Sequence, residues 1–137
     1  MDSLGSKGEH RISEWLTNKG YLILERNWRT RTGEIDIIAL DKTEQTSSGG
    51  VLVFVEVKTL LKTELSDLDL IINKKKQERI IKTAKHFLVN NRKYNTMYIR
   101  FDVIILQSNP FLTQPPKIVH LKDAFGDWDE SYEIVTL

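Results

Sequence analysis

The stretch "VLVFVEVK", Val51 to Lys58, has the pattern of a strand that is buried on both faces and then ends in charge. Side chains alternate across a strand, so the face that carries Phe54 continues with Glu56 and Lys58. Valines occupy the opposite face. An acid and a base therefore stand two positions apart at the end of an otherwise apolar strand.

The preceding stretch, "GEIDIIAL" at 33–40, shows the same change in reverse order. Its period of two predicts an apolar face formed by Ile35, Ile37 and Ala39. The other face begins with Glu34 and Asp36 and then becomes apolar. We expect the two stretches to form an antiparallel hairpin around the polar, glycine-ended loop at 41–50.

The register of this hairpin decides where its charges meet. If the loop is centred near Thr46, the numbers of paired residues sum to about 92. The predicted neighbours are then Leu40 with Leu52, Ile38 with Phe54, Asp36 with Glu56, and Glu34 with Lys58. Apolar residues face apolar residues, while three acids and one lysine gather at the far end.

Carboxylates brought together at a partly buried sheet edge repel one another unless positive charge lies between them. Lys58 can compensate one of these charges. A divalent cation would compensate more, and oxygen ligands suit Mg²⁺ or Mn²⁺. The pattern therefore predicts a metal site built on Asp36 and Glu56.

The rest of the chain predicts an α/β fold with the order αβββαβ. Further segments are a helix over 6–20, strands over 21–29, 97–106 and 117–121, a helix over 73–91 and an irregular or partly helical tail from residue 122. We expect one mixed sheet of four or five strands flanked by helices, as in restriction-endonuclease-like cores. A length of 137 residues predicts one domain, with its core at about 8–125 and an acidic C-terminal tail at 126–137.

Composition excludes several classes of protein. The chain has no cysteine, so it has neither disulfides nor thiolate metal sites. Its start lacks a secretory signal and no run reaches transmembrane length, which predicts a cytoplasmic protein without a membrane partner. The formal net charge of +1 hides a basic segment, because residues 74–93 carry eight lysines and arginines against one acid.

An acid twenty residues ahead of a Glu-x-Lys motif, on adjacent strands after an opening helix, resembles the PD-(D/E)xK nuclease superfamily. A closer resemblance is to the YraN-like uncharacterised protein family, which is related in fold to archaeal Holliday junction resolvases. It rests on four blocks in order, "RNWRTRTGEIDIIA" at 26–39, "VFVEVK" at 53–58, "RFDVI" at 100–104 and "KDAF" at 122–125. The resemblance covers nearly the whole chain, from about Gly8 to Phe125.

The resemblance implies a role for each matching residue. Asp36 and Glu56 would bind Mg²⁺ or Mn²⁺, with help from the backbone carbonyl of Val57. Lys58 would orient the attacking water and stabilise charge that develops on phosphorus. Two further catalytic candidates are Glu34, in the Gly-Glu-Ile-Asp block, and Glu9, on the first helix.

The helix at 73–91 is the candidate nucleic-acid surface. The resemblance implies that Lys76 and Gln77 lie at positions that often face the site. Its apolar stripe leaves Lys75, Arg79 and neighbouring basic residues pointing outward. A phosphate backbone would bind there with strong salt dependence. Leu60 departs from the family pattern, which often has a basic residue there.

Each candidate also has a structural alternative. Asp36 and Glu56 could form an exposed ion-pair cluster at a sheet edge. Glu9 could complete a capping box that starts at Ser6, and Glu34 could face water. Arg100 and Asp102 open the fourth strand and are expected to form an internal ion pair that braces the rim of the site.

The function that these observations favour is a metal-dependent endonuclease. We expect it to hydrolyse phosphodiester bonds in nucleic acid, with DNA, including branched DNA, as the favoured substrate. A homodimer is one form in which it could act. The alternative is a nucleic-acid-binding or scaffolding module that keeps the fold without turnover, because fold alone does not imply activity.

Overall fold

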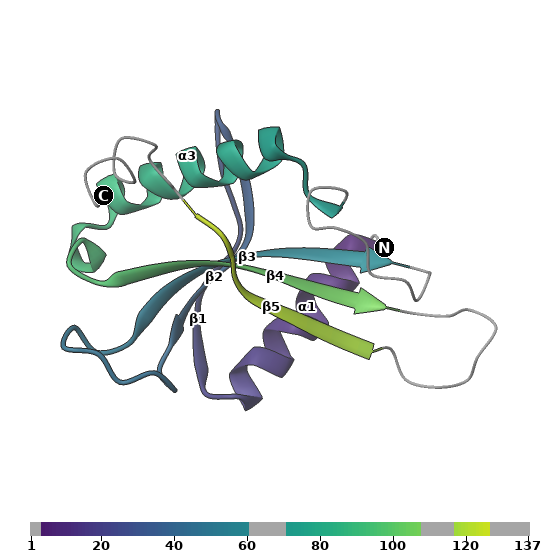
Figure 1. Cartoon of the computed structure of the whole chain (residues 1–137), viewed down its shortest axis with the longest axis horizontal. Coiled ribbons are helices and arrows are strands. Elements are labelled where there is room, and N and C mark those ends of the chain that lie inside the picture. Colours follow the sequence, from purple (N-terminus) through teal and green to yellow (C-terminus); the bar gives the residue numbers. More distant parts are fainter. Residues whose placement is uncertain (1–3, 61–70, 108–116, 127–137) are drawn as a thin grey trace, which may run out of the picture.

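The computed structural model describes residues 4–60, 71–107 and 117–126 (Figure 1). Expectations for 61–70, 108–116 and the tail from 127 lie outside these residues. The elements are α1 (Leu4–Asn18), β1 (Tyr21–Thr30), β2 (Gly33–Asp41), β3 (Val51–Leu60), α3 (Lys74–Asn90), the 3-10 turn η1 (Arg92–Tyr94), β4 (Tyr98–Gln107) and β5 (Lys117–Phe125). The α/β architecture and the mixed sheet flanked by two helices are as expected.

The five strands form one sheet in the order β1-β2-β3-β4-β5. All neighbours are antiparallel except β3 and β4, which run parallel. Parallel neighbours need a long crossover connection, and α3 lies in this one. Figure 1 shows α3 over one face of the sheet and α1 against the other.

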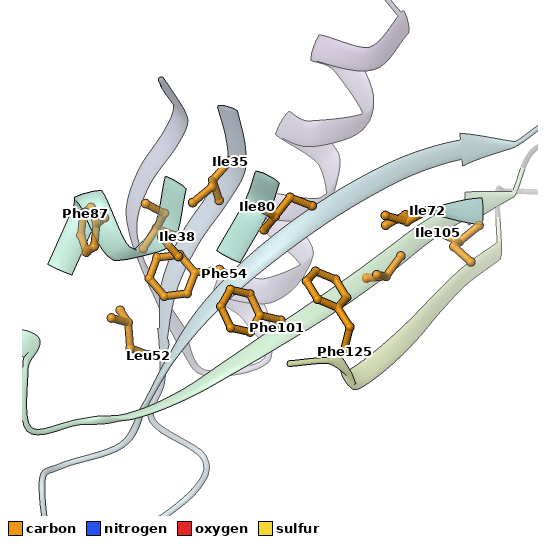
Figure 2. Packing of buried hydrophobic residues seen from close by; sticks show 12 residues of the cluster. Ile35, Ile38, Leu52, Phe54, Ile72, Ile80, Phe87, Phe101, Ile105 and Phe125 are labelled. Atoms are coloured by element: carbon orange, nitrogen blue, oxygen red, sulfur yellow. The ribbon is translucent and has the colours of Figure 1, made fainter. Parts of the chain in front are cut away.

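The face under α3 holds the aromatic part of the core (Figure 2). Phe54 stacks on Phe101 at 5.5 Å between ring centroids, and Phe101 stacks on Phe125 at 5.3 Å. Phe87 of α3 meets Phe54 edge-on at 5.9 Å. These contacts fix α3 above β3, which places its first turn near the charged end of that strand.

The face under α1 is aliphatic. Ile12 and Leu16 are fully buried against valines of β3 and against Ile37 of β2. The helix ends at Asn18, and Gly20 follows with a φ of +100°, a conformation that glycine adopts without strain. This packing directs one stripe of α1 toward the sheet.

The predicted register of the central hairpin is confirmed where the ladder forms. Ile38 pairs with Phe54 and Leu40 with Leu52, and the last pair at the charged end is Ile37 with Val55. The predicted face of β2 is wrong at one residue. Ile35 packs in the cluster under α3, whereas Ile37 packs under α1. The regular alternation of side chains between the two faces of β2 is therefore interrupted between Ile35 and Ile37, where the ladder with β3 ends.

Several element boundaries differ from expectation, most of them by one or two residues. The first helix begins at Leu4, and β5 continues to Phe125 instead of ending at residue 121. The register of β4 and β5 shifts between Phe101 and Val103, and Asp123 takes a left-handed φ of +53°. The sequence suggested that the strand ends at this point, but the strand continues through the bulge.

Arg100 and Asp102 form the expected internal ion pair, at 2.9 Å. They do not brace the predicted site. Their further partners are Asp41, Glu44, Tyr21 and His120, which gather near the start of β1. We call Tyr21, Asp41, Arg100, Asp102 and His120 the buried brace.

Candidate metal centre

The site begins where β2 leaves β3. Beyond the Ile37–Val55 pair, the backbone N–H of Val57 donates to Asp36 Oδ2 at 2.8 Å. A side chain thus takes the place of a ladder acceptor, and Asp36 is drawn against β3. Burial raises the pKa of Asp36, although the Val57 N–H opposes the shift.

Glu56 reaches the same place from the side of α3. Its side chain is 7% exposed, and Lys76 Nζ lies 3.6 Å from Oε1. The carboxyl groups of Asp36 and Glu56 are close enough for each to shift the pKa of the other. Burial and the charge of Asp36 raise the pKa of Glu56 to about 8, against the pull of Lys76 and Lys58. The two acids are therefore not an exposed edge pair.

Glu9 joins them from α1. One carboxylate oxygen from each of Glu9, Glu34 and Asp36 lies within 4.8 Å of the others. Burial raises the pKa of Glu9 to about 7, with the charge of Asp36 the next cause. Because α1 begins at Leu4, Glu9 lies inside the helix, and the capping-box alternative is wrong. We call Glu9, Glu34, Asp36 and Glu56 the acidic cluster.

Glu34 does not lie beside Lys58 as predicted. Its Cα pairs with Arg29 across β1 and β2, and its carboxylate lies 3.3 Å from Arg29 Nε. Since β2 turns from β3 after Ile37, Glu34 follows β1 instead. Its side chain is 32% exposed, so Glu34 faces water only in part.

Lys58 follows Glu56 on β3 and is half-buried, opposite Ile105 of β4. Its charge lowers the pKa of Glu56, which puts it within electrostatic reach of the cluster. Gln77 donates to the backbone oxygen of Ile72 at 3.0 Å, and Lys76 contacts the acids through Glu56. The carbonyl of Val57 as a ligand stays a prediction.

Asn27 was not predicted. It has a φ of +52°, a conformation that few residues other than glycine adopt, and its side chain acts to lower the pKa of Glu9. Asparagine is among the residues that tolerate this conformation best. No periodic signal marks it, because the bulge of β1 that precedes it depends on pairing with β2.

The donor chemistry of the cluster fits a divalent cation. Its ligands are carboxylate oxygens from three different elements, which Mg²⁺ and Mn²⁺ prefer. Within the described residues, the ion pairs of the acidic cluster are those of Glu56 with Lys76, at 3.6 Å, and of Glu34 with the exposed Arg29, at 3.3 Å. Because the pKa values of Glu9 and Glu56 are raised to about 7 and about 8, bound protons offset part of the negative charge of the cluster near neutral pH.

Comparison with known proteins identifies the family of this chain. The family described as "Uncharacterised protein family UPF0102" matches residues 8–106. The chain belongs to the UPF0102 family. This is the YraN-like family that the four sequence blocks resemble.

Relatives named "UPF0102 protein" match over most of both chains. The protein from Treponema denticola is 88% identical over 127 residues, covering 93% of this chain and 98% of the relative. The protein from Treponema pallidum strain Nichols is 52% identical over 124 residues, covering 90% and 93%. One from Clostridium botulinum strain 657 is 40% identical over 122 residues, covering 89% and 93%. These names give a UPF0102 family and no activity.

No helix in the described parts of this UPF0102 protein is both long and apolar enough to cross a membrane.

Proposed function

We propose that this protein is a divalent-metal-dependent endonuclease that hydrolyses phosphodiester bonds in nucleic acid, with DNA as the favoured substrate. The convergence of Glu9, Glu34 and Asp36 within 4.8 Å carries the proposal. Glu56 adjoins them almost fully buried. Carboxylates brought this close together in a partly buried place repel one another, and a bound cation would relieve that repulsion.

The metal would be held by the acidic cluster. When bound, Mg²⁺ or Mn²⁺ supplies Lewis acidity toward a phosphoryl oxygen and acidifies water. The protein's own residues would do the remaining work. Lys58 would hold the attacking water and stabilise negative charge on phosphorus, and Lys76 would hold Glu56 in its buried position.

The test measures metal binding and cleavage separately. The protein is titrated with Mn²⁺ by calorimetry, and labelled single-stranded, duplex, flap and four-way DNA are incubated with Mg²⁺ or Mn²⁺. Asp36→Asn should lose both Mn²⁺ binding and cleavage. Lys58→Ala should keep Mn²⁺ binding and lose roughly 10²- to 10³-fold in cleavage rate, as expected for one group that stabilises transition-state charge.

Glu14→Gln is the matched control, because Glu14 is an exposed acid of α1 that pairs with His10 instead of the cluster. It should change neither measurement. Cleavage absent on every substrate, with DNA binding intact, would favour the scaffold alternative. Equal Mn²⁺ affinity in the wild type and Asp36→Asn would remove the metal site.

A further inference from the structure

The turn between β1 and β2 is fastened to α3 by a chain of threonine hydroxyls. Thr32 Oγ1 lies 2.8 Å from Thr30 Oγ1 and 3.0 Å from Thr83 Oγ1, which donates to the backbone of Arg79 at 2.8 Å. Thr83 is fully buried. Figure 1 shows the tip of this hairpin standing beside α3.

The fit between the turn and the helix is close. A Cβ on Gly33 would lie 3.2 Å from Thr83 Oγ1, and Gly33 has a φ of +153°. The φ favours glycine here, and a larger residue would also press on Thr83 where the turn meets the helix. The turn and α3 are held at a fixed spacing instead of being two independent surface elements.

Both elements present positive charge. The turn carries Arg29, whose side chain is 74% exposed, and the exposed Arg31. On α3, the exposed residues Lys75, Arg79 and Lys82 follow at i, i+4 and i+7, so they form one stripe. Arg79 lies next to the turn, since its Cδ would be 4.0 Å from a Cβ on Gly33.

This basic ridge (Arg29, Arg31, Lys75, Arg79 and Lys82) adjoins the acidic cluster on two sides. Arg29 contacts Glu34, and Lys76, next to Lys75 in sequence, contacts Glu56. Its members are arginine and lysine and include none of the aromatic residues that stack single-stranded bases. Rigidly spaced cations of this kind suit the phosphates of a duplex.

We infer that the basic ridge binds the backbone of duplex DNA, so that the phosphates beside the cleaved one lie across the β1–β2 turn and α3. The inference rests on the proposed function and extends the surface from the helix to the turn. It assigns Arg31 and Lys82, which are not members of the acidic cluster, to DNA binding.

The experiment measures how the affinity for one duplex depends on salt, in EDTA so that no cleavage occurs. The plot of log K against log salt has a slope of about −0.9 for each phosphate contact. Arg31→Ala/Lys82→Ala should make the slope shallower by about 1.8 and weaken binding by roughly 60-fold at 0.1 M salt.

The matched control is Arg92→Ala/Lys93→Ala, which also removes one exposed arginine and one exposed lysine, from η1. Its slope should stay at the wild-type value. An equal change in both double variants would mean that only net charge matters, and would overturn the ridge. An equal or larger loss on single-stranded DNA of the same sequence would overturn the assignment to duplex.

Failure of the ridge and failure of the nuclease proposal are distinguishable. Mn²⁺ titration of Arg31→Ala/Lys82→Ala should match the wild type, because neither residue belongs to the acidic cluster. If the slope changes as expected while no substrate is cleaved, the DNA surface stands and the nuclease proposal fails. If cleavage occurs with an unchanged slope, the ridge is wrong.

Discussion

Two groups of acids lie around the same sheet, and the pKa values of Asp41 and Asp102 in one move in the opposite direction to those of Glu9 and Glu56 in the other. In the buried brace, the pKa values of Asp41 and Asp102 are lowered, although burial alone would raise them. In the acidic cluster, burial raises the pKa of Glu56 to about 8 and that of Glu9 to about 7. Burial is common to both, so it does not explain the difference.

The difference lies in the supply of hydrogen-bond donors. Asp102 accepts from His120 at 2.7 Å, from Arg100 at 2.9 and 3.0 Å, and from the backbone N–H of Asp123 at 2.9 Å. Asp36 accepts one backbone bond, from Val57. A carboxylate with several donors is a structural element, whereas a group of acids that lacks them is suited to take up a cation.

The largest effect is expected when the cation of the buried brace, the guanidinium of Arg100, is removed. Arg100→Met leaves Asp41 and Asp102 buried without their shared partner, and should lower the free energy of unfolding by about 3–5 kcal/mol. Urea denaturation measures this. Arg92→Met, at an exposed arginine of η1, should change it little. A loss below about 1 kcal/mol for Arg100→Met would mean that the brace is not structural.

The second prediction concerns the binding of Mn²⁺ to the acidic cluster, where the cation would offset the negative charge of the carboxylates. Mn²⁺ at about 100 times its Kd should raise the free energy of unfolding by about 2.7 kcal/mol, because it binds the folded state. Asp36→Asn should abolish most of this gain. The same gain in that variant would show that Mn²⁺ binds elsewhere.

The smallest effect expected is on pH dependence without metal. The raised pKa values of Glu9 and Glu56 mean that the folded state binds more protons than the unfolded chain between about pH 4.5 and 8. Stability should therefore fall as pH rises through this window. The lowered pKa values of Asp41 and Asp102 act oppositely, and their contribution is lost only in stronger acid.

Glu56→Gln tests this assignment, because it removes one of the two groups. It should flatten the fall and stabilise the metal-free protein at pH 8 by on the order of 1 kcal/mol. Denaturation midpoints from pH 5 to 8 in EDTA measure the profile, with Glu14→Gln as the control. A profile that Glu56→Gln leaves unchanged would place the titration in other groups.

The sequence predicted the parts of the fold that depend on local pattern. The ladder from Ile37 to Asp41 could be derived because two apolar half-faces match in only one register. The same alternation singled out Asp36 and Glu56. It failed at Ile35, because the hydrogen bond between Asp36 and Val57 replaces a ladder bond, and no pattern of apolar residues records that exchange.

Other features depend on contacts between segments far apart in the chain. Asn27 joins the site through Glu9, and the Thr32–Thr83 bond links residues 51 positions apart. The extension of β5 depends on Asp102, which accepts from the backbone of Asp123 beside the bulge. Propensity cannot predict these features, because each is set by tertiary pairing.

The loop between β2 and β3 lies at the opposite end of the hairpin from Asp36. Asp41 lies five residue steps along β2 from Asp36, roughly 16 Å at the usual rise of a strand. Gly49 has open space around it, and Ser47 is exposed. A fluorophore or an affinity tag grafted between them would report on the protein while leaving its chemistry untouched.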